Sequence, residues 1–353
     1  MDKVISIPRL ANYHVPARYL FKHITNIKLI VPPDITEKTI ELGSKYSPDF
    51  ICTPFKYTLG SFIEGLERGA NILIQPGGGC RYGYYYELQE KILKDLGYNC
   101  KIYSFVTCGH TDLKRVYKLI KSIDPKINIF KLLYYGLITK NMINYMDKMD
   151  DYIRKNKAFE EKKGSFDLSL SNALKDFENT KGILNLRRLY KKHLNNLKNI
   201  KLNKPKKVRK VGVIGELYTV MEPFANYNIE EFLIKNNIEV TRYTNATYLL
   251  FKKKHLTKKY LKNLKNVKYK MGADAMDNIY HTKYFIDNNY DGIIHIKSSF
   301  CTPEIGSMGI INKMCKENDM PVLFFSFDSN TSKVGLETRL EAFIDMLEMR
   351  DNN

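Results

Sequence analysis

One short stretch of the chain joins an apolar run, a flexible turn and a cysteine. Residues 70–86 read Ala-Asn-Ile-Leu-Ile-Gln-Pro-Gly-Gly-Gly-Cys-Arg-Tyr-Gly-Tyr-Tyr-Tyr. The apolar run stops at Pro76, as a buried parallel strand does, and the glycines allow the backbone to approach a ligand closely. Helical spacing of apolar residues after Arg81 places Cys80 at a first helical turn. Backbone N–H groups there stabilise a thiolate, the form of cysteine that attacks electrophiles and binds metals.

Two further cysteines have a similar local pattern. Cys52 and Cys301 each begin a Cys-Thr-Pro sequence and precede a helical pattern. Proline suits the first helical turn because its missing N–H costs nothing there. An extended strand is predicted before Cys52, and an apolar strand over 292–297 precedes Cys301. Parallel α/β sheets bind ligands outside the carboxyl ends of their strands, so the thiols converge if two α/β units face each other.

The composition is that of a globular protein large enough for two domains. The chain has 353 residues, of which 44% are hydrophobic and 27% are charged. No apolar run reaches the ~18 residues that span a bilayer, and the first residues lack the apolar core of a secretory signal. We therefore expect a cytoplasmic protein without a membrane partner. The six widely spaced cysteines favour metal binding or catalysis over a disulfide scaffold in such a reducing compartment.

The net charge of +19 is large. Such a charge suits nucleic acid, an anionic ligand such as coenzyme A, or an anionic partner. Lysines are spread along the chain, however, with denser runs at residues 201–210 and 252–268. We interpret these runs first as solvated surface, and we consider nucleic-acid binding the weakest interpretation.

The order of apolar patterns predicts an α/β fold of two Rossmann-like parallel-sheet domains that face each other, with a helical arm between them. Long amphipathic helices are predicted from residue 112 to about 200, and we interpret them as structural support. The segment from Lys201 to Lys207 is the predicted linker. The predicted domains are residues 1–111, the arm and linker at 112–205, and residues 206–353. Strands are predicted at 27–31, before Cys52, and at 71–75, 99–105, 208–214, 239–243, 292–297 and 322–326.

The sequence does not match several well-known functional motifs. The run from Gly78 to Gly83 has the outer spacing of a phosphate loop but lacks the following Lys and Ser/Thr. The sequence has no His-Glu-x-x-His motif and no Cys-x-x-Cys pair, which weakens zinc and thioredoxin-like interpretations. Cys108 and His110 could form a nucleophile and base, although residues so near in sequence seldom point together. Cys108 is equally a packed small hydrophobe.

Ligation of an iron–sulfur cluster is the best chemical account of Cys52, Cys80 and Cys301. A cubane cluster usually takes four thiolates, so three would leave one iron open to water, substrate or another ligand. Buried structural thiols are the alternative, and the spacing leaves both open.

The blocks around these cysteines resemble the 2-hydroxyacyl-CoA dehydratase D-component family, in the branch of acyl-CoA dehydratase or CoA-enzyme activase related proteins. The blocks are Cys52-Thr53-Pro54-Phe55-Lys56 with Gly60, Glu64, Gly65, Leu66, Gly69 and Ala70, then Gln75 to Gly83, Phe300 to Glu304, Ser326-Phe327-Asp328, and Gly335 with Glu337 to Phe343. The resemblance covers both α/β halves and is weakest over the helical arm.

This resemblance implies a [4Fe-4S] cluster held by Cys52, Cys80 and Cys301. In the family, an ATP-hydrolysing activase injects a low-potential electron, and the dehydratases expel a hydroxyl group from a 2-hydroxyacyl-CoA through a ketyl radical. Relatives with a double cubane reduce small molecules instead. No block of this chain matches the family's acyl-CoA pocket, and the true dehydratases work as two related subunits. A related subunit or homodimer and an acyl-CoA substrate are therefore expectations from the family.

We expect an oxygen-sensitive iron–sulfur protein that accepts an electron from the activase for reductive or radical chemistry, as a dehydratase-like lyase or a reductase component. The alternatives are a non-catalytic electron carrier or scaffold and a double-cubane reductase. No general acid or base is assigned. Structural roles are predicted for Cys100, Cys108 and Cys315. Arg81 is predicted to balance the charge of the cluster or to contact the partner, and Lys56 and Glu304 are predicted to face one cleft. Arg339 and Glu341 are predicted to form a structural ion pair.

Overall fold

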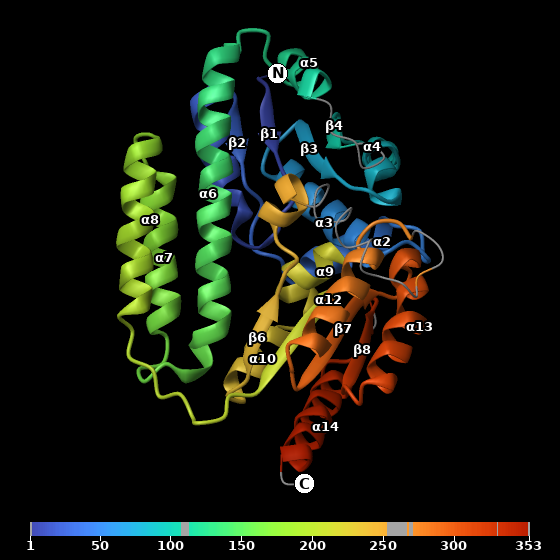
Figure 1. Ribbon diagram of the computed structural model, residues 1–353. Coiled ribbons are helices and arrows are strands. Elements are labelled where there is room, and N and C mark those ends of the chain that lie inside the picture. Colours follow the sequence, from blue (N-terminus) through green and yellow to red (C-terminus); the bar gives the residue numbers. More distant parts are fainter. Residues whose placement is uncertain (1, 107–112, 253–266, 268–270, 330, 352–353) are drawn as a thin grey trace. The chain divides into compact units, whose positions relative to one another are not determined.

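The computed structural model describes residues 2–106, 113–252, 267, 271–329 and 331–351 (Figure 1). The chain forms two compact units. The first comprises residues 1–146 and 167–198, and the second comprises residues 147–166 and 199–353. Within the described residues each unit has its own four-stranded sheet with parallel pairing throughout, which confirms the predicted α/β fold with two parallel-sheet domains. The expected boundaries near residues 111 and 205 stay predictions.

The sheet of the first unit has the strand order β2-β1-β3-β4. Its strands are β1 (Val4–Ser6), β2 (Lys28–Ile30), β3 (Ile72–Gly77) and β4 (Lys101–Val106). Successive residues of a strand point to opposite faces of the sheet, and here each face packs into its own apolar core. Ile72 and Ile74 belong to one core with Ile5, whereas Leu73 belongs to the other with Phe62.

Helices surround this first sheet. They are α1 (His14–Ile24), α2 (Glu37–Tyr46), α3 (Thr53–Glu67), α4 (Tyr85–Asp95) and α5 (Leu113–Ile123), with short 3-10 turns η1 (Ala11–Tyr13) and η2 (Arg81–Tyr84). The predicted helical arm corresponds to α6 (Ile129–Asn156), α7 (Ser165–Glu178) and α8 (Ile183–Lys198). α6 contributes residues to both units. Within the first unit, α6 packs on α8 through stacked rings of Tyr145 and Tyr190, whose centroids lie 4.1 Å apart.

The strand predicted before Cys52 is wrong. Residues 47–52, all of which are described, form a turn between α2 and α3, and Phe50 is exposed. The two helices pack directly against each other at glycines: a Cβ at Gly43 would lie 1.8 Å from the carbonyl oxygen of Lys56, and one at Gly60 would lie 1.9 Å from that of Thr39. The fourth strand is β1, which is too short to show a clear alternation in the sequence.

The second unit repeats the strand order of the first, as β6-β5-β7-β8. Its strands are β5 (Lys210–Gly215), β6 (Glu239–Arg242), β7 (Gly292–Ser298) and β8 (Val322–Phe327). Its helices are α9 (Leu217–Met221), α10 (Ile229–Lys235), α12 (Ala275–Asp287), α13 (Thr302–Glu317) and α14 (Lys333–Asp351), with short turns η3 (Lys157–Phe159), η4 (Phe224–Asn226) and the π-helical η5 (Tyr248–Lys252). Ile294 and Ile296 face one core and Ile293 the other.

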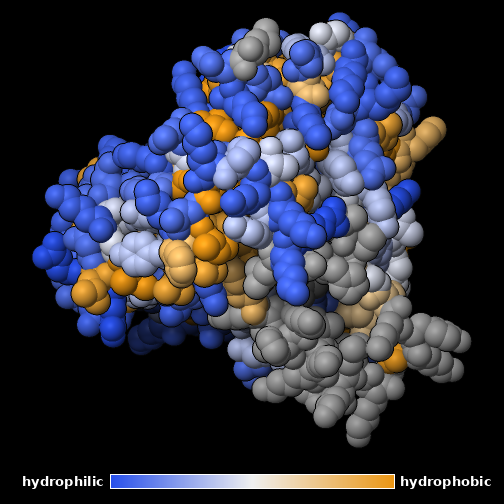
Figure 2. All heavy atoms as spheres, turned by 90° about the horizontal axis from the view of Figure 1, so that it is seen from above, coloured by the Kyte–Doolittle hydropathy of each residue, from blue (hydrophilic) through white to orange (hydrophobic). Residues whose placement is uncertain are grey.

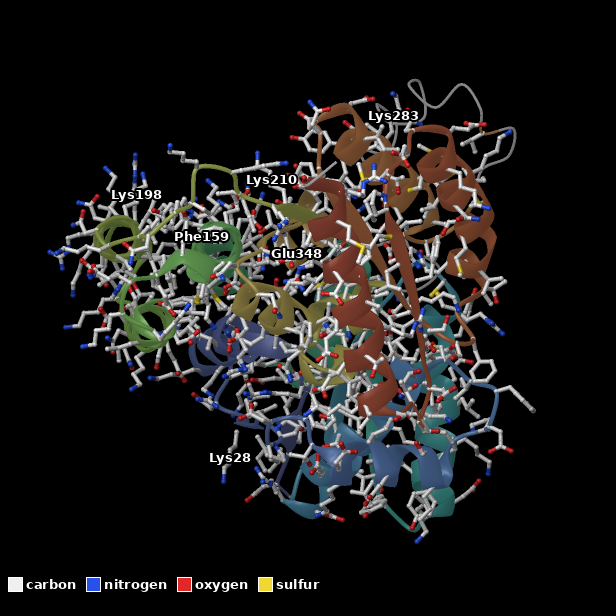
Figure 3. All side chains as sticks on the ribbon, turned by 90° about the horizontal axis from the view of Figure 1, so that it is seen from below. Lys28, Phe159, Lys198, Lys210, Lys283 and Glu348 are labelled. Carbon is white, nitrogen blue, oxygen red and sulfur yellow. The ribbon has the colours of Figure 1, made fainter. Side chains whose placement is uncertain are left out.

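Polar and apolar groups are both present on the surface, and the exposed large apolar side chains include Phe50, Phe130 and Leu184. Figure 2 shows one face, on which hydrophilic groups predominate and hydrophobic groups form separate patches. Exposed lysines such as Lys28 and Lys198 contrast with Phe159, which is buried (Figure 3). Among the described helices, none combines the length and the apolar content required to cross a membrane.

Candidate functional site

Two of the predicted site cysteines follow equivalent strands of the two sheets. Cys80 comes after β3, and Cys301 comes after β7. In each unit this strand lies beside the first strand, β1 or β5, at the point where the strand order reverses. Parallel α/β sheets bind their ligands outside the carboxyl ends of the strands at such a point. Each unit therefore presents one cysteine where its own fold favours a ligand.

All three predicted site cysteines stand at the start of a helix or helical turn. Cys52 is the N-cap of α3, Cys301 is the N-cap of α13, and Cys80 is the N-cap of η2. The Cys80 sulfur accepts a hydrogen bond from the Tyr82 N–H at 3.5 Å. Partial positive charge at the starts of α3 and α13 favours the thiolate over the thiol.

The first unit brings Cys52 and Cys80 to the same tyrosine. The Tyr85 Oη lies 3.0 Å from the Cys52 Sγ. Burial raises the pKa of Tyr85 above its ordinary value, and the negative charges of Cys52 and then Cys80 raise it further. Both sulfurs are half-buried and pack against one apolar cluster that includes Phe55 and Leu59.

Sequence reasoning missed this role of Tyr85. The sequence pattern predicts Tyr85 only as an apolar position of the helix after Cys80, and nothing in the local sequence distinguishes it from the neighbouring tyrosines. Its ring is fixed by edge-to-face contacts with Phe55 and Tyr82, at centroid distances of 4.9 and 5.6 Å. The role of Tyr85 therefore depends on a contact between α4 and the start of α3, and local periodicity does not predict such a tertiary contact.

A buried ammonium group lies near Cys301. The Lys297 side chain, only 4% exposed as a residue, donates hydrogen bonds to the carbonyl oxygens of Ser298 and Ser299 at 3.3 and 3.4 Å. Burial lowers the pKa of Lys297, whereas the negative charges of Cys301 and Glu304 act in the opposite direction. The second unit thus supplies a positive charge beside the predicted ligand.

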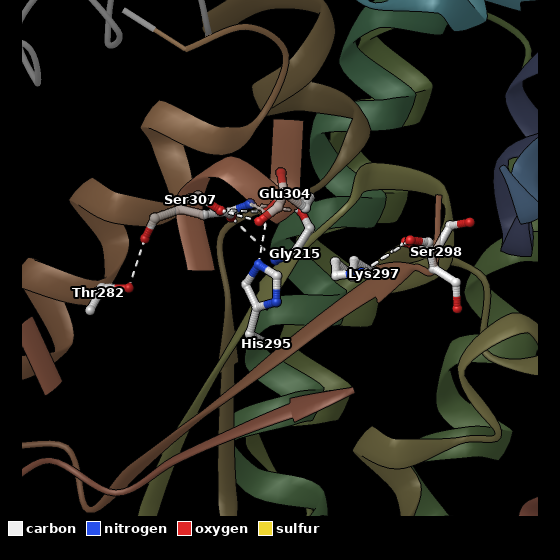
Figure 4. A network of polar contacts seen from close by, with 9 residues as sticks. Gly215, Thr282, His295, Lys297, Ser298, Glu304 and Ser307 are labelled. Atoms are coloured by element: carbon white, nitrogen blue, oxygen red, sulfur yellow. Dashed lines mark hydrogen bonds and ion pairs between the residues drawn. The ribbon is translucent and has the colours of Figure 1, made fainter. Parts of the chain in front are cut away.

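Glu304 belongs to a closed polar network rather than to an open cleft (Figure 4). Its Oε2 lies 2.8 Å from the His295 Nε2 and accepts hydrogen bonds from the Asn278 amide at 2.9 Å and the Ser307 hydroxyl at 3.3 Å. The His295 and Glu304 side chains are 0% and 1% exposed. This network joins β7 to α12 and α13, so it holds the start of α13 on the sheet. In the first unit, Lys56 is likewise buried.

The predicted ion pair between Arg339 and Glu341 is wrong. Arg339 donates a hydrogen bond to the Phe324 carbonyl oxygen at 2.7 Å, and its guanidinium lies over the Phe325 ring. Residues two apart on a helix point to different sides, so this pair cannot meet along α14.

Cys100 and Cys315 have different surroundings from the candidate site cysteines. Both are buried in the apolar cores, at 5% and 0% exposure. Burial raises the pKa of Cys100 to about 11 and that of Cys315 to about 12. They remain thiols at neutral pH, as packed small hydrophobes do. Cys108 and His110 lie outside the described residues.

The structure brings together two of the three predicted ligands. Cys52 and Cys80 meet around Tyr85 in the first unit, and Cys301 belongs to the second. Among the residues with a described placement, no group of three or more His, Cys, Asp or Glu side chains is arranged to hold a metal ion. The placement of Cys301 as a ligand to the same group therefore stays a prediction.

These features define an α/β protein with two similar parallel-sheet units and cysteines at their helix starts. A comparison with family models gives the relationship: residues 239–347 match 2-hydroxyglutaryl-CoA dehydratase, D-component. The match lies within the second unit, includes Cys301, and confirms the resemblance to this family for that part of the chain. No curated protein matches the chain.

Proposed function

We propose that this protein is a dehydratase-like iron–sulfur component that accepts a low-potential electron from an ATP-dependent activase. Cys52, Cys80 and Cys301 hold one [4Fe-4S] cluster. The observation that carries the proposal is the equivalent placement of Cys80 and Cys301 after β3 and β7, with Cys52 near the same Tyr85 as Cys80. The family match over residues 239–347, a range that includes Cys301, supports the dehydratase-like part of the proposal.

The surroundings of the three sulfurs fit an iron–sulfur cluster. Cys52, Cys80 and Cys301 are half-buried, and Cys52 and Cys80 pack against an apolar cluster. The starts of α3 and α13 favour the thiolate forms of Cys52 and Cys301, and the ammonium of Lys297 offsets negative charge near Cys301. Cys100 and Cys315, by contrast, are buried in the apolar cores, and burial raises the pKa of both thiols.

When bound, the cluster supplies a one-electron carrier with one iron that no cysteine holds. This chain would hold the group through three cysteines that cap α3, η2 and α13. Glycines before Cys80 allow the chain to turn there: Gly77 has φ 80°, and a Cβ at Gly78 would lie 3.1 Å from the Tyr82 side chain.

The electron donor and the substrate are proposed from what is known of the same family. An activase of this family delivers the electron, and a 2-hydroxyacyl-CoA is the proposed substrate, whose phosphates suit a chain with a net charge of +19. A related subunit or a second copy completes the active assembly. A double-cubane reductase would need further thiolates, and the core positions of Cys100 and Cys315 disfavour that alternative.

Anaerobic electron paramagnetic resonance tests the electron-accepting role. Protein reconstituted with iron and sulfide is mixed with an activase of the family and a reductant, with ATP or without nucleotide. We expect a reduced-cluster signal that needs ATP at low reductant strength, together with loss of hydroxyl from a 2-hydroxyacyl-CoA. Reduction without turnover would instead make the protein an electron carrier. A reconstituted cluster that the activase never reduces would refute the proposed function.

A further inference from the structure

We propose that the Tyr85 hydroxyl donates a hydrogen bond to the Cys52 sulfur when that sulfur is a cluster ligand, and that this bond makes the cluster easier to reduce. The inference rests on the proposed function, because it assigns a role at the same site. Tyr85 acts through Cys52, so it is a positioning and tuning residue rather than a catalytic one.

The contact itself has the geometry of a hydrogen bond. The Tyr85 Oη and the Cys52 Sγ are 3.0 Å apart, and the residues lie 33 positions apart in the sequence. A phenol is protonated at neutral pH, because its ordinary pKa is about 10. A protonated phenol beside a thiolate can only be the donor, because the thiolate has no proton to give.

The position of the hydroxyl is fixed by its surroundings. Tyr85 is 8% exposed, and its ring makes edge-to-face contacts with Phe55 and Tyr82. Tyr85 begins α4 directly after η2, the turn that Cys80 caps. Phe55 lies in the first turn of α3, which Cys52 caps. The same two helix starts therefore hold both the cysteines and the donor, so the hydrogen bond is preorganised.

A donor at this place has a predictable effect on reduction. An added electron increases the negative charge on the cluster sulfurs, and a hydrogen bond to a more negative acceptor is stronger. The bond therefore stabilises the reduced form more than the oxidised form. A difference of about tenfold in the reduction equilibrium corresponds to about 59 mV for one electron.

The experiment compares Tyr85→Phe with the adjacent Tyr86→Phe. The first change removes the hydroxyl at the sulfur and keeps the ring, whereas the second removes a hydroxyl that donates to the Glu87 carboxylate at 2.8 Å. Each protein is reconstituted anaerobically, its iron is counted, and the cluster midpoint potential is measured by titration with a redox mediator. We expect full cluster content in both variants, a potential lower by about 59 mV in Tyr85→Phe, and no shift in Tyr86→Phe.

A second variant tests the same bond without removing it. Introducing 3-fluorotyrosine at position 85 makes the phenol a stronger donor, so the potential should rise, and this arm decides the question if Tyr85→Phe does not fold. Equal potentials in wild type and in either Tyr85 variant would overturn the inference and leave the proposed function intact. A wild-type protein that binds no cluster would overturn both.

Discussion

At the scale of single residues, the polar network around Glu304 should be a stability determinant. Glu304→Ala removes the shared acceptor of the buried Asn278, His295 and Ser307 groups. We expect the free energy of unfolding of the second unit to fall by about 3 kcal/mol, because buried polar groups lose their partner. Urea titration measures this loss. Glu337→Ala, at an exposed pair with Lys333, is the control and should change it by less than about 0.5 kcal/mol.

A second residue-scale prediction concerns pH. Glu216 begins α9, and burial raises its pKa from 4.5 to about 7. Between these values the folded protein binds more protons than the unfolded chain, so the free energy of unfolding should fall as pH rises. The contribution is at most about 1.4 kcal/mol per pH unit. The free energy of unfolding, measured by urea titration, should fall more between pH 5 and pH 7 in wild type than in Glu216→Gln. An equal loss in the two proteins would contradict the assignment.

Sequence reasoning at this scale identified cysteines but not their partners. Cys80 and Cys301 were predictable because an apolar run and a helical pattern on either side reveal their place at a strand end. The contact of Tyr85 with Cys52 was not, since it joins two helix starts through tertiary packing. The closed network of Glu304 depends in the same way on Asn278, which lies on a separate helix.

At the scale of elements, the close packing of α2 on α3 should control the geometry of Cys52. Gly60→Ala would place a Cβ 1.9 Å from the Thr39 carbonyl oxygen, so the helices must separate. We expect a loss of at least about 3 kcal/mol in stability and reduced iron uptake, because Cys52 caps α3.

A matched control for this substitution exists in α6. A Cβ at Gly136 meets nothing within 4 Å, and the residue is helical. Gly136→Ala should therefore raise the free energy of unfolding by about 0.5 to 1 kcal/mol through helix propensity. Thermal unfolding and iron content measure both variants. If Gly60→Ala were as stable as Gly136→Ala, the direct packing of α2 on α3 would be wrong.

The elements themselves were predictable where they are long or strongly apolar. The strands at β3, β5 and β7 and the long helices of the arm match the expected patterns. The error before Cys52 arose because the apolar Phe50 and Ile51 lie in a short connection between two packed helices. β1 has only three residues, so it carries too little pattern to be recognised without its neighbours in the sheet.

At the scale of the whole molecule, the two units share one strand order, so Cys80 and Cys301 lie at equivalent sheet edges. The class of fold was predictable, because alternating strand and helix patterns occur on both sides of a helical region. The shared use of Cys80 and Cys301 as ligands of one group, which the family resemblance implies, stays a prediction, because these residues are 221 positions apart and belong to different units. Local patterns contain no information about whether two such edges serve one ligand.

The most direct test is therefore the iron and acid-labile sulfide content of anaerobically reconstituted protein. Wild type is compared with Cys52→Ala, Cys80→Ala and Cys301→Ala, and with Cys100→Ala and Cys315→Ala as controls in the cores. We predict about four irons per chain in wild type and in both controls, and loss or destabilisation of the cluster in each of the other variants. Folded wild type without iron, or Cys301→Ala with a complete and stable cluster, would contradict the account.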